Sequence, residues 1–169
     1  LFQIPEGVHY LNCAYMSPLL RSVEEAGVRA MQLKRNPIQI SPQDFFTGAE
    51  KLRINFGKLV NCSPSQVAVI PSASYGLSTA IQNLPKDKGS KALVVADEFP
   101  SGYYSIEKWC RENGKHLLTV KPPSVTQSRG KAWNQGILES IDSDTAVVVM
   151  SSIHWADGTM YDLKAISLR

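Results

Sequence analysis

Residues 71–76, Pro-Ser-Ala-Ser-Tyr-Gly, are of the types that bind an anion through backbone N–H groups and hydroxyls. They follow an apolar run at 67–70 and precede a helical pattern that begins at Leu77. A helix start carries unpaired N–H groups and the positive end of the helix dipole, so it favours a phosphate. Ser72 or Ser74 could instead serve only as the cap of this helix. The turn alone leaves both interpretations open.

Further candidate residues follow other strand-like runs. Apolar runs occupy 92–96, 117–120 and 146–150, and residues 97–103 and 151–158 after the first and last of them are rich in hydroxyl, aromatic and ionisable side chains. In open α/β sheets ligands bind beyond the carboxyl ends of the strands. A phosphate on the turn at 71–76, the ring of Phe99 and the polar groups near Ser151 would together suit a flat phosphorylated ring.

Several of these residues also have a purely structural interpretation. Phe99 could fold back into the core, and His154 could be a general base or a packed structural residue. Asp97 and Glu98 are adjacent, and neighbours on a strand point to opposite sides, so they make a poor acid/base pair. The chain has neither a dinucleotide-binding G-x-G-x-x-G motif nor a Walker A motif, and its three histidines lack metal-ligand spacing.

The second half of the sequence alternates strands with helices. Helical patterns near 75–84, 103–113 and 133–141 separate four strand-like runs, of which the first is 67–70. Three of the runs are continuously apolar, as strands buried on both faces are. This alternation predicts an α/β domain over 65–169, with a mainly parallel sheet, helices on both sides and an end in mid-sheet.

The first half, 1–64, is predicted to be an N-terminal arm and helices. Tyr10 and Leu11 are the best candidates for a short strand in the arm, and one helix is expected from about 19 to 34. Ser41, Pro42 and Asp44 open a second helix. Its apolar residues recur at spacings of three and four, which predicts a stripe packed in a core: Phe45, Ala49, Leu52, Phe56 and Leu59.

Composition excludes several classes of function. The net charge is only +3, and the 18 basic residues are scattered, so we expect no nucleic-acid partner. We also expect no membrane association, since no apolar run is long enough to cross a membrane. Three widely spaced cysteines indicate neither a disulfide framework nor a metal knuckle, which favours a reducing compartment such as the cytoplasm.

Four stretches in this order carry a family resemblance: 10–15 (YLNCAY), 71–77 (PSASYGL), 97–101 (DEFPS) and 151–158 (SSIHWADG). With them the chain resembles the N-terminal part of a class V aminotransferase-fold enzyme, a pyridoxal 5′-phosphate (PLP) group that includes cysteine desulfurases, kynureninases and isopenicillin N epimerase-like proteins. The resemblance implies a fold-type I PLP-transferase, cut before its large-domain sheet is complete. It also implies a homodimer.

The resemblance assigns roles to six residues. The N–H groups of Ala73 and Ser74, with the Ser74 hydroxyl, would hold the cofactor phosphate, and Phe99 would stack on its pyridine ring. Ser151 and Trp155 would line its other edge, and Tyr15 would face the substrate. Phe99 and Trp155 depart from cysteine desulfurases, which have His and Asn there, and are nearer the kynureninase-like and epimerase-like patterns.

The resemblance implies an enzyme that acts on an amino acid or amine through an external aldimine. In the family, the Lys that forms the Schiff base and the Asp that pairs with the pyridine nitrogen come later than Arg169, and no lysine of this chain is assigned that role. Two other functions remain open at this point. One is a non-enzymatic α/β interaction domain, and the other is a phosphate-ligand-binding module, such as a flavodoxin-like one, without covalent chemistry.

Overall fold

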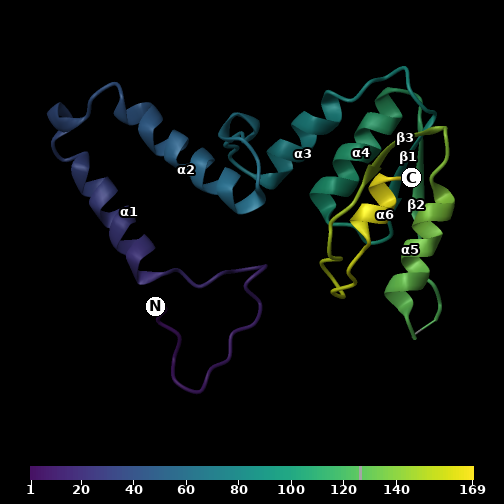
Figure 1. Cartoon of the computed structure of the whole chain (residues 1–169), viewed down its shortest axis with the longest axis horizontal. Helices are drawn as coiled ribbons and strands as arrows, with labels where there is room; N and C mark the ends of the chain where they lie inside the picture. Colours follow the sequence, from purple (N-terminus) through teal and green to yellow (C-terminus); the bar gives the residue numbers. More distant parts are fainter. Residues whose placement is uncertain (126) are drawn as a thin grey trace. The chain divides into compact units, whose positions relative to one another are not determined.

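The computed structural model describes residues 1–125 and 127–169, and it divides into two compact units, Leu1–Val69 and Ile70–Arg169. Figure 1 shows the helices and strands of both units. No helix in the described ranges is long and apolar enough to cross a membrane.

The first unit is helical in its described part. The hydroxyl and N–H of Ser41 both donate to the Asp44 carboxylate at 2.8 Å, which lowers the pKa of Asp44 and ties down the start of the second helix. That helix ends at Asn61, which is left-handed and donates its N–H to Gly57. The elements correspond to the two predicted helices, with two short 3-10 turns: α1 Arg21–Leu33, η1 Pro37–Gln39, α2 Asp44–Val60 and η2 Pro64–Gln66.

Two predictions for this unit are wrong. Tyr10 and Leu11 form no strand, and Leu11 is 91% exposed. The apolar stripe of α2 is not packed in a core: Phe45 is 77% and Leu59 80% exposed, and Ala49, Leu52 and Phe56 are exposed too. The apolar face of a helix is buried only when another element supplies an opposing apolar face. In the described part of this unit none does, since α1 buries no residue and α2 buries only Gly57.

The second unit confirms the predicted α/β class. Its three parallel strands lie in the order β2-β1-β3, with β1 at Lys91–Val95, β2 at His116–Val120 and β3 at Thr145–Val149. The helices also follow the predicted alternation, and the helical segment expected at Leu163 and Ile166 forms α6: α3 Ala73–Gln82, α4 Pro100–Glu112, α5 Arg129–Ser140 and α6 Leu163–Ser167.

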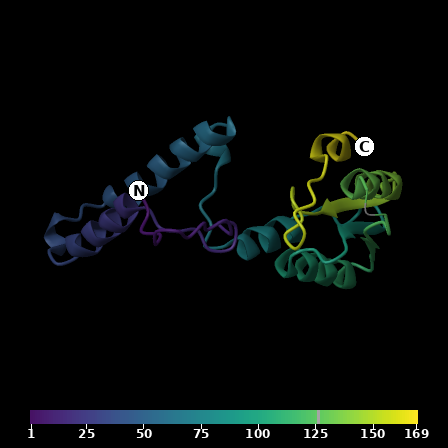
Figure 2. The same ribbon diagram turned by 90° about the horizontal axis from the view of Figure 1, so that it is seen from below.

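The sheet is covered on both faces, as Figures 1 and 2 show. On one face Leu93 and Val95 of β1 pack with Trp133 and Ile137 of α5. The other face packs against α3 and α4. The buried residues on this side come from the sheet and from both helices: Ile81, Ala92, Ile106, Trp109, Cys110 and Val149. Alternate residues of β1 therefore face opposite helical layers, which is why the strand is apolar throughout.

The predicted strand at 67–70 is absent. These residues make no ladder, and Val69 and Ile70 are about half exposed. An extended segment becomes a strand only when a neighbour supplies hydrogen-bond partners. In the described sheet β1 lies between β2 and β3, and residues 67–70 pair with neither of them.

Gly89 closes the connection into β1 and is predicted to be intolerant of any side chain. Its φ is +58°, and a Cβ there would lie 2.5 Å from the carbonyl oxygen of Asp144. Gly114 is a matched control, because its φ is +62° but a Cβ would meet nothing within 4 Å. We expect Gly114→Ala to lower the free energy of unfolding by about 1–2 kcal/mol through backbone strain alone. Gly89→Ala should lose about 1–3 kcal/mol more through the steric clash, and equal losses in urea unfolding would contradict the close approach.

Candidate functional site

The N-terminus of α3 presents free backbone donors. Ser72 is extended and its hydroxyl accepts the N–H of Tyr75 at 3.1 Å, so Ser72 is the helix cap. The N–H groups of Ala73 and Ser74, the first two helical residues, have no acceptor among the residues that the structure describes. The cap and the anion-binding interpretations of this turn therefore apply to different residues of it.

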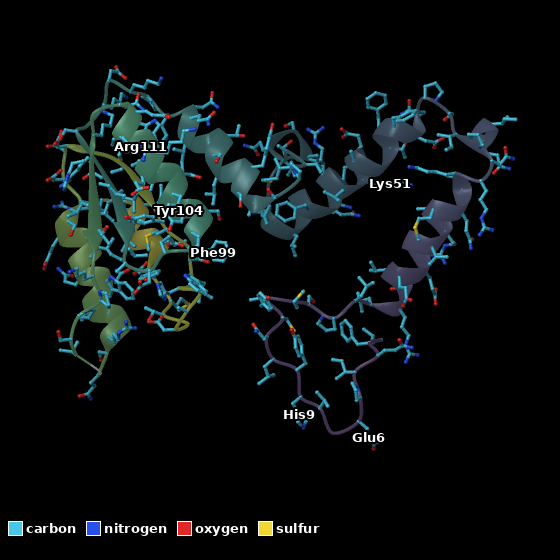
Figure 3. The ribbon with its side chains drawn as sticks, turned by 180° about the vertical axis from the view of Figure 1, so that it is seen from behind. Glu6, His9, Lys51, Phe99, Tyr104 and Arg111 are labelled. Atoms are coloured by element: carbon cyan, nitrogen blue, oxygen red, sulfur yellow. The ribbon has the colours of Figure 1, made fainter. Side chains whose placement is uncertain are left out.

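The chain turns sharply at Asp97, just after β1. This residue is left-handed, with φ +54°, and it is followed by the buried Glu98 and then by Phe99, which caps α4 just ahead of Pro100. Phe99 is 50% exposed, so it is not a core residue. Figure 3 shows its ring beside the start of α4, with Tyr104 about one turn further along.

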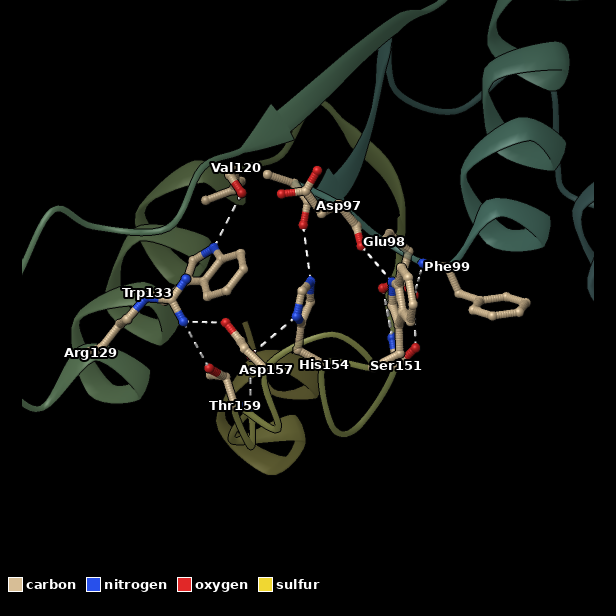
Figure 4. Close-up of polar contacts among 12 residues, drawn as sticks. Asp97, Glu98, Phe99, Val120, Arg129, Trp133, Ser151, His154, Asp157 and Thr159 are labelled. Atoms are coloured by element: carbon tan, nitrogen blue, oxygen red, sulfur yellow. Dashed lines mark hydrogen bonds and ion pairs between the residues drawn. The ribbon is translucent and has the colours of Figure 1, made fainter. Parts of the chain in front are cut away.

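The Glu98 carboxylate joins the ends of β1 and β3. Its Oε1 accepts the N–H of Phe99 at 2.8 Å and the hydroxyl of Ser151 at 2.7 Å, and its Oε2 accepts the N–H of Ser151 at 3.0 Å (Figure 4). Sequence reasoning missed this residue because it weighed Glu98 only as a partner of Asp97. The available signal was a carboxylate placed directly after a buried strand and before a Phe-Pro helix start.

Trp155 and Phe99 form an aromatic pair beyond β1 and β3. Their ring centroids are 5.7 Å apart in an edge-to-face arrangement, and Trp155 is 58% exposed. The indole N–H of Trp155 donates to the carbonyl of Asp97 at 2.7 Å, which sets the orientation of the ring. The two rings, one from each strand end, thus form one exposed apolar wall.

His154 precedes Trp155 in the loop after β3 and is only 4% exposed. Its Nε2–H donates to the carbonyl of Ala96 at 3.2 Å, and its Nδ1 lies 3.1 Å from Oδ1 of Asp157. Trp133 packs against the ring, with centroids 5.2 Å apart. Both nitrogens are engaged inside the protein, so the geometry supports the packed structural role of His154 rather than that of a general base.

Asp157 in turn is held by α5. The Arg129 guanidinium donates to Oδ2 of Asp157 and, at 3.2 Å, to the Thr159 hydroxyl, while it lies over the Trp133 ring. Burial raises the pKa of Asp157, but hydrogen bonds from Arg129 and Thr159 and the charge of His154 outweigh this effect. Together they hold that pKa far below its usual range. This chain of contacts fixes the loop that carries Ser151 and Trp155.

A cavity of about 360 Å³ lies between α3 and α4. Ser74, Pro100 and Ser101 line it near the two helix starts, and it extends along the helices as far as Trp109 and Glu112. Of the five predicted cofactor residues only Ser74 is among the lining residues that the structure describes. The N-termini of α3 and α4 nevertheless lie side by side, since Ser74 of one and Pro100 of the other line the same cavity.

The second unit therefore brings three of the six predicted residues together at one place. Phe99, Ser151 and Trp155 meet around Glu98, while Ala73 and Ser74 begin the helix that packs on α4. Tyr15 belongs to the first unit and is 78% exposed, and its role toward a substrate stays a prediction. The described residues contain no group of three or more His, Cys, Asp or Glu that could hold a metal ion.

The depressed pKa of Asp157 predicts a pH-dependent contribution to stability. The unfolded carboxyl titrates near pH 4, so the contribution is complete above that pH and is lost as the pH falls toward the lower folded value. Asp157→Asn should lower the free energy of unfolding by about 1–3 kcal/mol at pH 7, and by less at pH 3. Urea unfolding at both values tests this, with the exposed Asp87→Asn as the control; a loss of equal size at both would contradict the assignment.

The similarity to known proteins points to one family. No protein-family model matches the chain. It is 25% identical over 124 residues to a kynureninase of Dictyostelium discoideum. The aligned region covers 70% of this chain and 28% of that protein. It is 28% identical over 119 residues to a kynureninase of Myxococcus xanthus, which covers 65% of this chain and 27% of that protein. The chain thus spans between a quarter and a third of the length of these relatives.

Two solved structures of the protein C-DES share the fold. One is a mutant with glycine covalently linked to the PLP cofactor; it has a TM-score of 0.78 at 17% identity, over 96% of this chain and 43% of that one. The other is the complex of this cystine C-S lyase with its product cysteine persulfide, with a TM-score of 0.73 at 16% identity, over 90% of this chain and 40% of that one. The chain is therefore similar in sequence to kynureninases and shares its fold with a PLP-bound enzyme, C-DES, as the class V aminotransferase-fold resemblance predicts.

Proposed function

We propose that the chain is the N-terminal, cofactor-binding part of a PLP-dependent enzyme that acts on an amino acid or amine. One observation carries the proposal: the exposed wall of Phe99 and Trp155 lies beyond the strand ends, in the same unit as the free N–H groups that begin α3. A flat ring with a phosphate needs both features. The similarity to kynureninases and to PLP-bound C-DES supports the same ligand.

The residues present fit PLP on their own chemistry. Ala73 and Ser74 offer two N–H donors without acceptors in the described chain, at the positive end of a ten-residue helix. Phe99 offers a half-exposed ring for stacking. Bound PLP would act as the electron sink that labilises a bond at the α-carbon of the substrate.

The hydrogen bonds of the site limit what its other residues do. The Ser151 hydroxyl donates its proton to Glu98, so toward a ligand it acts as an acceptor. The indole N–H of Trp155 is committed to the Asp97 carbonyl, so Trp155 contributes its ring and excludes water. Both residues are proposed to line the edge of the cofactor away from the phosphate.

The remaining parts of the proposal rest on the family resemblance. Tyr15 is proposed to face the substrate, and the Schiff-base Lys and the Asp for the pyridine nitrogen are proposed to lie after Arg169 in the whole protein. The interaction-domain and flavodoxin-like alternatives are not favoured, because the relatives and the solved neighbours are enzymes of one PLP family. Three free cysteines in the described chain are consistent with a cytoplasmic protein.

Ser74→Ala tests the phosphate site. It removes one hydroxyl that donates to a charged group while the backbone N–H stays, so the whole protein should bind PLP with a Kd raised about 10- to 150-fold. Ser78→Ala is the matched control, since Ser78 lies one turn further along α3 and its hydroxyl pairs with Ser105 at 3.1 Å. Absorbance titration with PLP measures both variants. An unchanged Kd would leave Ser74 as an ordinary helix residue, and a wild-type protein that binds no PLP would overturn the proposed function.

The family resemblance also leads us to propose a homodimer. Light scattering of the purified whole protein should return twice the mass of one chain, with no dependence on concentration in the micromolar range. A monomer of undiminished activity would refute this part of the proposal alone.

A further inference from the structure

We propose that Glu98 is a positioning residue that sets the spacing between the Phe99 ring and the loop after β3. This inference rests on the proposed function for its ligand, but its geometric basis is independent of it. The side chain lies at the contact between the two strand ends and is 93% buried, with a residue exposure of 7%.

A single oxygen atom holds both sides of the site. Oε1 of Glu98 accepts from the backbone of Phe99 and from the hydroxyl of Ser151, at 2.8 and 2.7 Å. The distance between the Phe99 backbone and the Ser151 hydroxyl is therefore set through that atom. Oε2 adds the N–H of Ser151 and prevents the carboxylate from rotating away.

Glu98 is one of three ties between the same two segments. The residues Ala96, Asp97 and Glu98 accept in succession from His154, Trp155 and Ser151. The first two acceptors are backbone carbonyls, which any residue would supply. Glu98 alone uses its side chain, so this tie depends on the residue type.

The cost of burial argues against a role in stability alone. A buried carboxylate is expensive unless it is well hydrogen bonded, and no basic side chain in the described ranges forms an ion pair with Glu98. An apolar residue of similar size would avoid that cost of burial, but it would leave the donors of Phe99 and Ser151 without their acceptor. What the carboxylate provides is a pair of acceptor oxygens that hold three donors of Phe99 and Ser151 at one place.

Glu98→Gln separates a structural role from a positioning role. It keeps the size of the side chain but replaces one of the two acceptor oxygens with a donor group. A carboxylate only accepts, whereas an amide must place its NH₂ group against either the Ser151 N–H or the Phe99 N–H. One of the three hydrogen bonds is then lost to a contact between two donors. The two sides of the site are no longer held at the same spacing.

The fluorescence of Trp155 reports this spacing without any ligand. Of the three tryptophans in this chain, Trp109 and Trp133 are only 4% and 1% exposed, so acrylamide reaches mainly Trp155 among them. The part of the quenching that Trp155→Phe removes measures Trp155 in the whole protein. In the whole protein free of added PLP, we expect Glu98→Gln to increase the quenching constant as the contact with Phe99 loosens. A Trp155→Phe background should abolish that difference.

PLP supplies the second readout. At PLP saturation, Glu98→Gln should alter the visible circular dichroism per bound PLP. Its Kd for PLP should rise by up to about tenfold, because binding must then restore a geometry that the lost hydrogen bond held. Glu139→Gln is the matched control, because that carboxylate is exposed on α5, away from the site, and accepts a hydrogen bond from Gln135. It should leave quenching, dichroism and Kd unchanged.

Each outcome decides the proposal. A lower melting temperature with wild-type quenching, dichroism and Kd would make Glu98 a structural brace and overturn it. Changed quenching in a protein whose wild type binds no PLP would uphold the positioning role while the proposed function fails. Changed quenching together with changed dichroism and Kd would support both.

Discussion

The pairing of β1 with β2 on one side and β3 on the other determines where ligand chemistry can occur in this chain. Because all three strands are parallel, their carboxyl ends meet at one edge of the sheet. Both faces of β1 are buried under helices, so the polar residues that follow it have nowhere to go except that edge. The turn at Asp97, the loop with Ser151 and the start of α4 are all consequences of this geometry.

Two electrostatic arrangements then shape the edge. On one side a buried carboxylate, Glu98, gathers three donors and joins the two strand ends. On the other, Arg129 anchors Asp157, and Asp157 orients His154. Between them the loop after β3 is held at Ser151, His154 and Asp157, and Trp155 has little freedom to move. A loop held in this way can present a rigid wall to a ligand, which lowers the entropic cost of binding.

The first unit contrasts with this order. Its two helices have well-formed ends, but the apolar side chains of α2 stay largely exposed in the described chain. The chain spans 43% of one C-DES structure and between a quarter and a third of the length of the two kynureninases.

The sequence by itself determined what depends on local spacing. The alternation of apolar runs and helical patterns predicted three of the strands and the helices around them. It also limited the cap of α3 to Ser72 or Ser74, because these features follow from periodicity and backbone donors within a few residues. Only the tertiary structure decided whether 67–70 would find a strand partner, whether the stripe of α2 would be covered, and which residue joins the site. Glu98 and Ser151 are 53 positions apart, and their hydrogen bonds exist because strand order makes β1 and β3 neighbours. No local pattern encodes a contact that arises from which strands happen to pair.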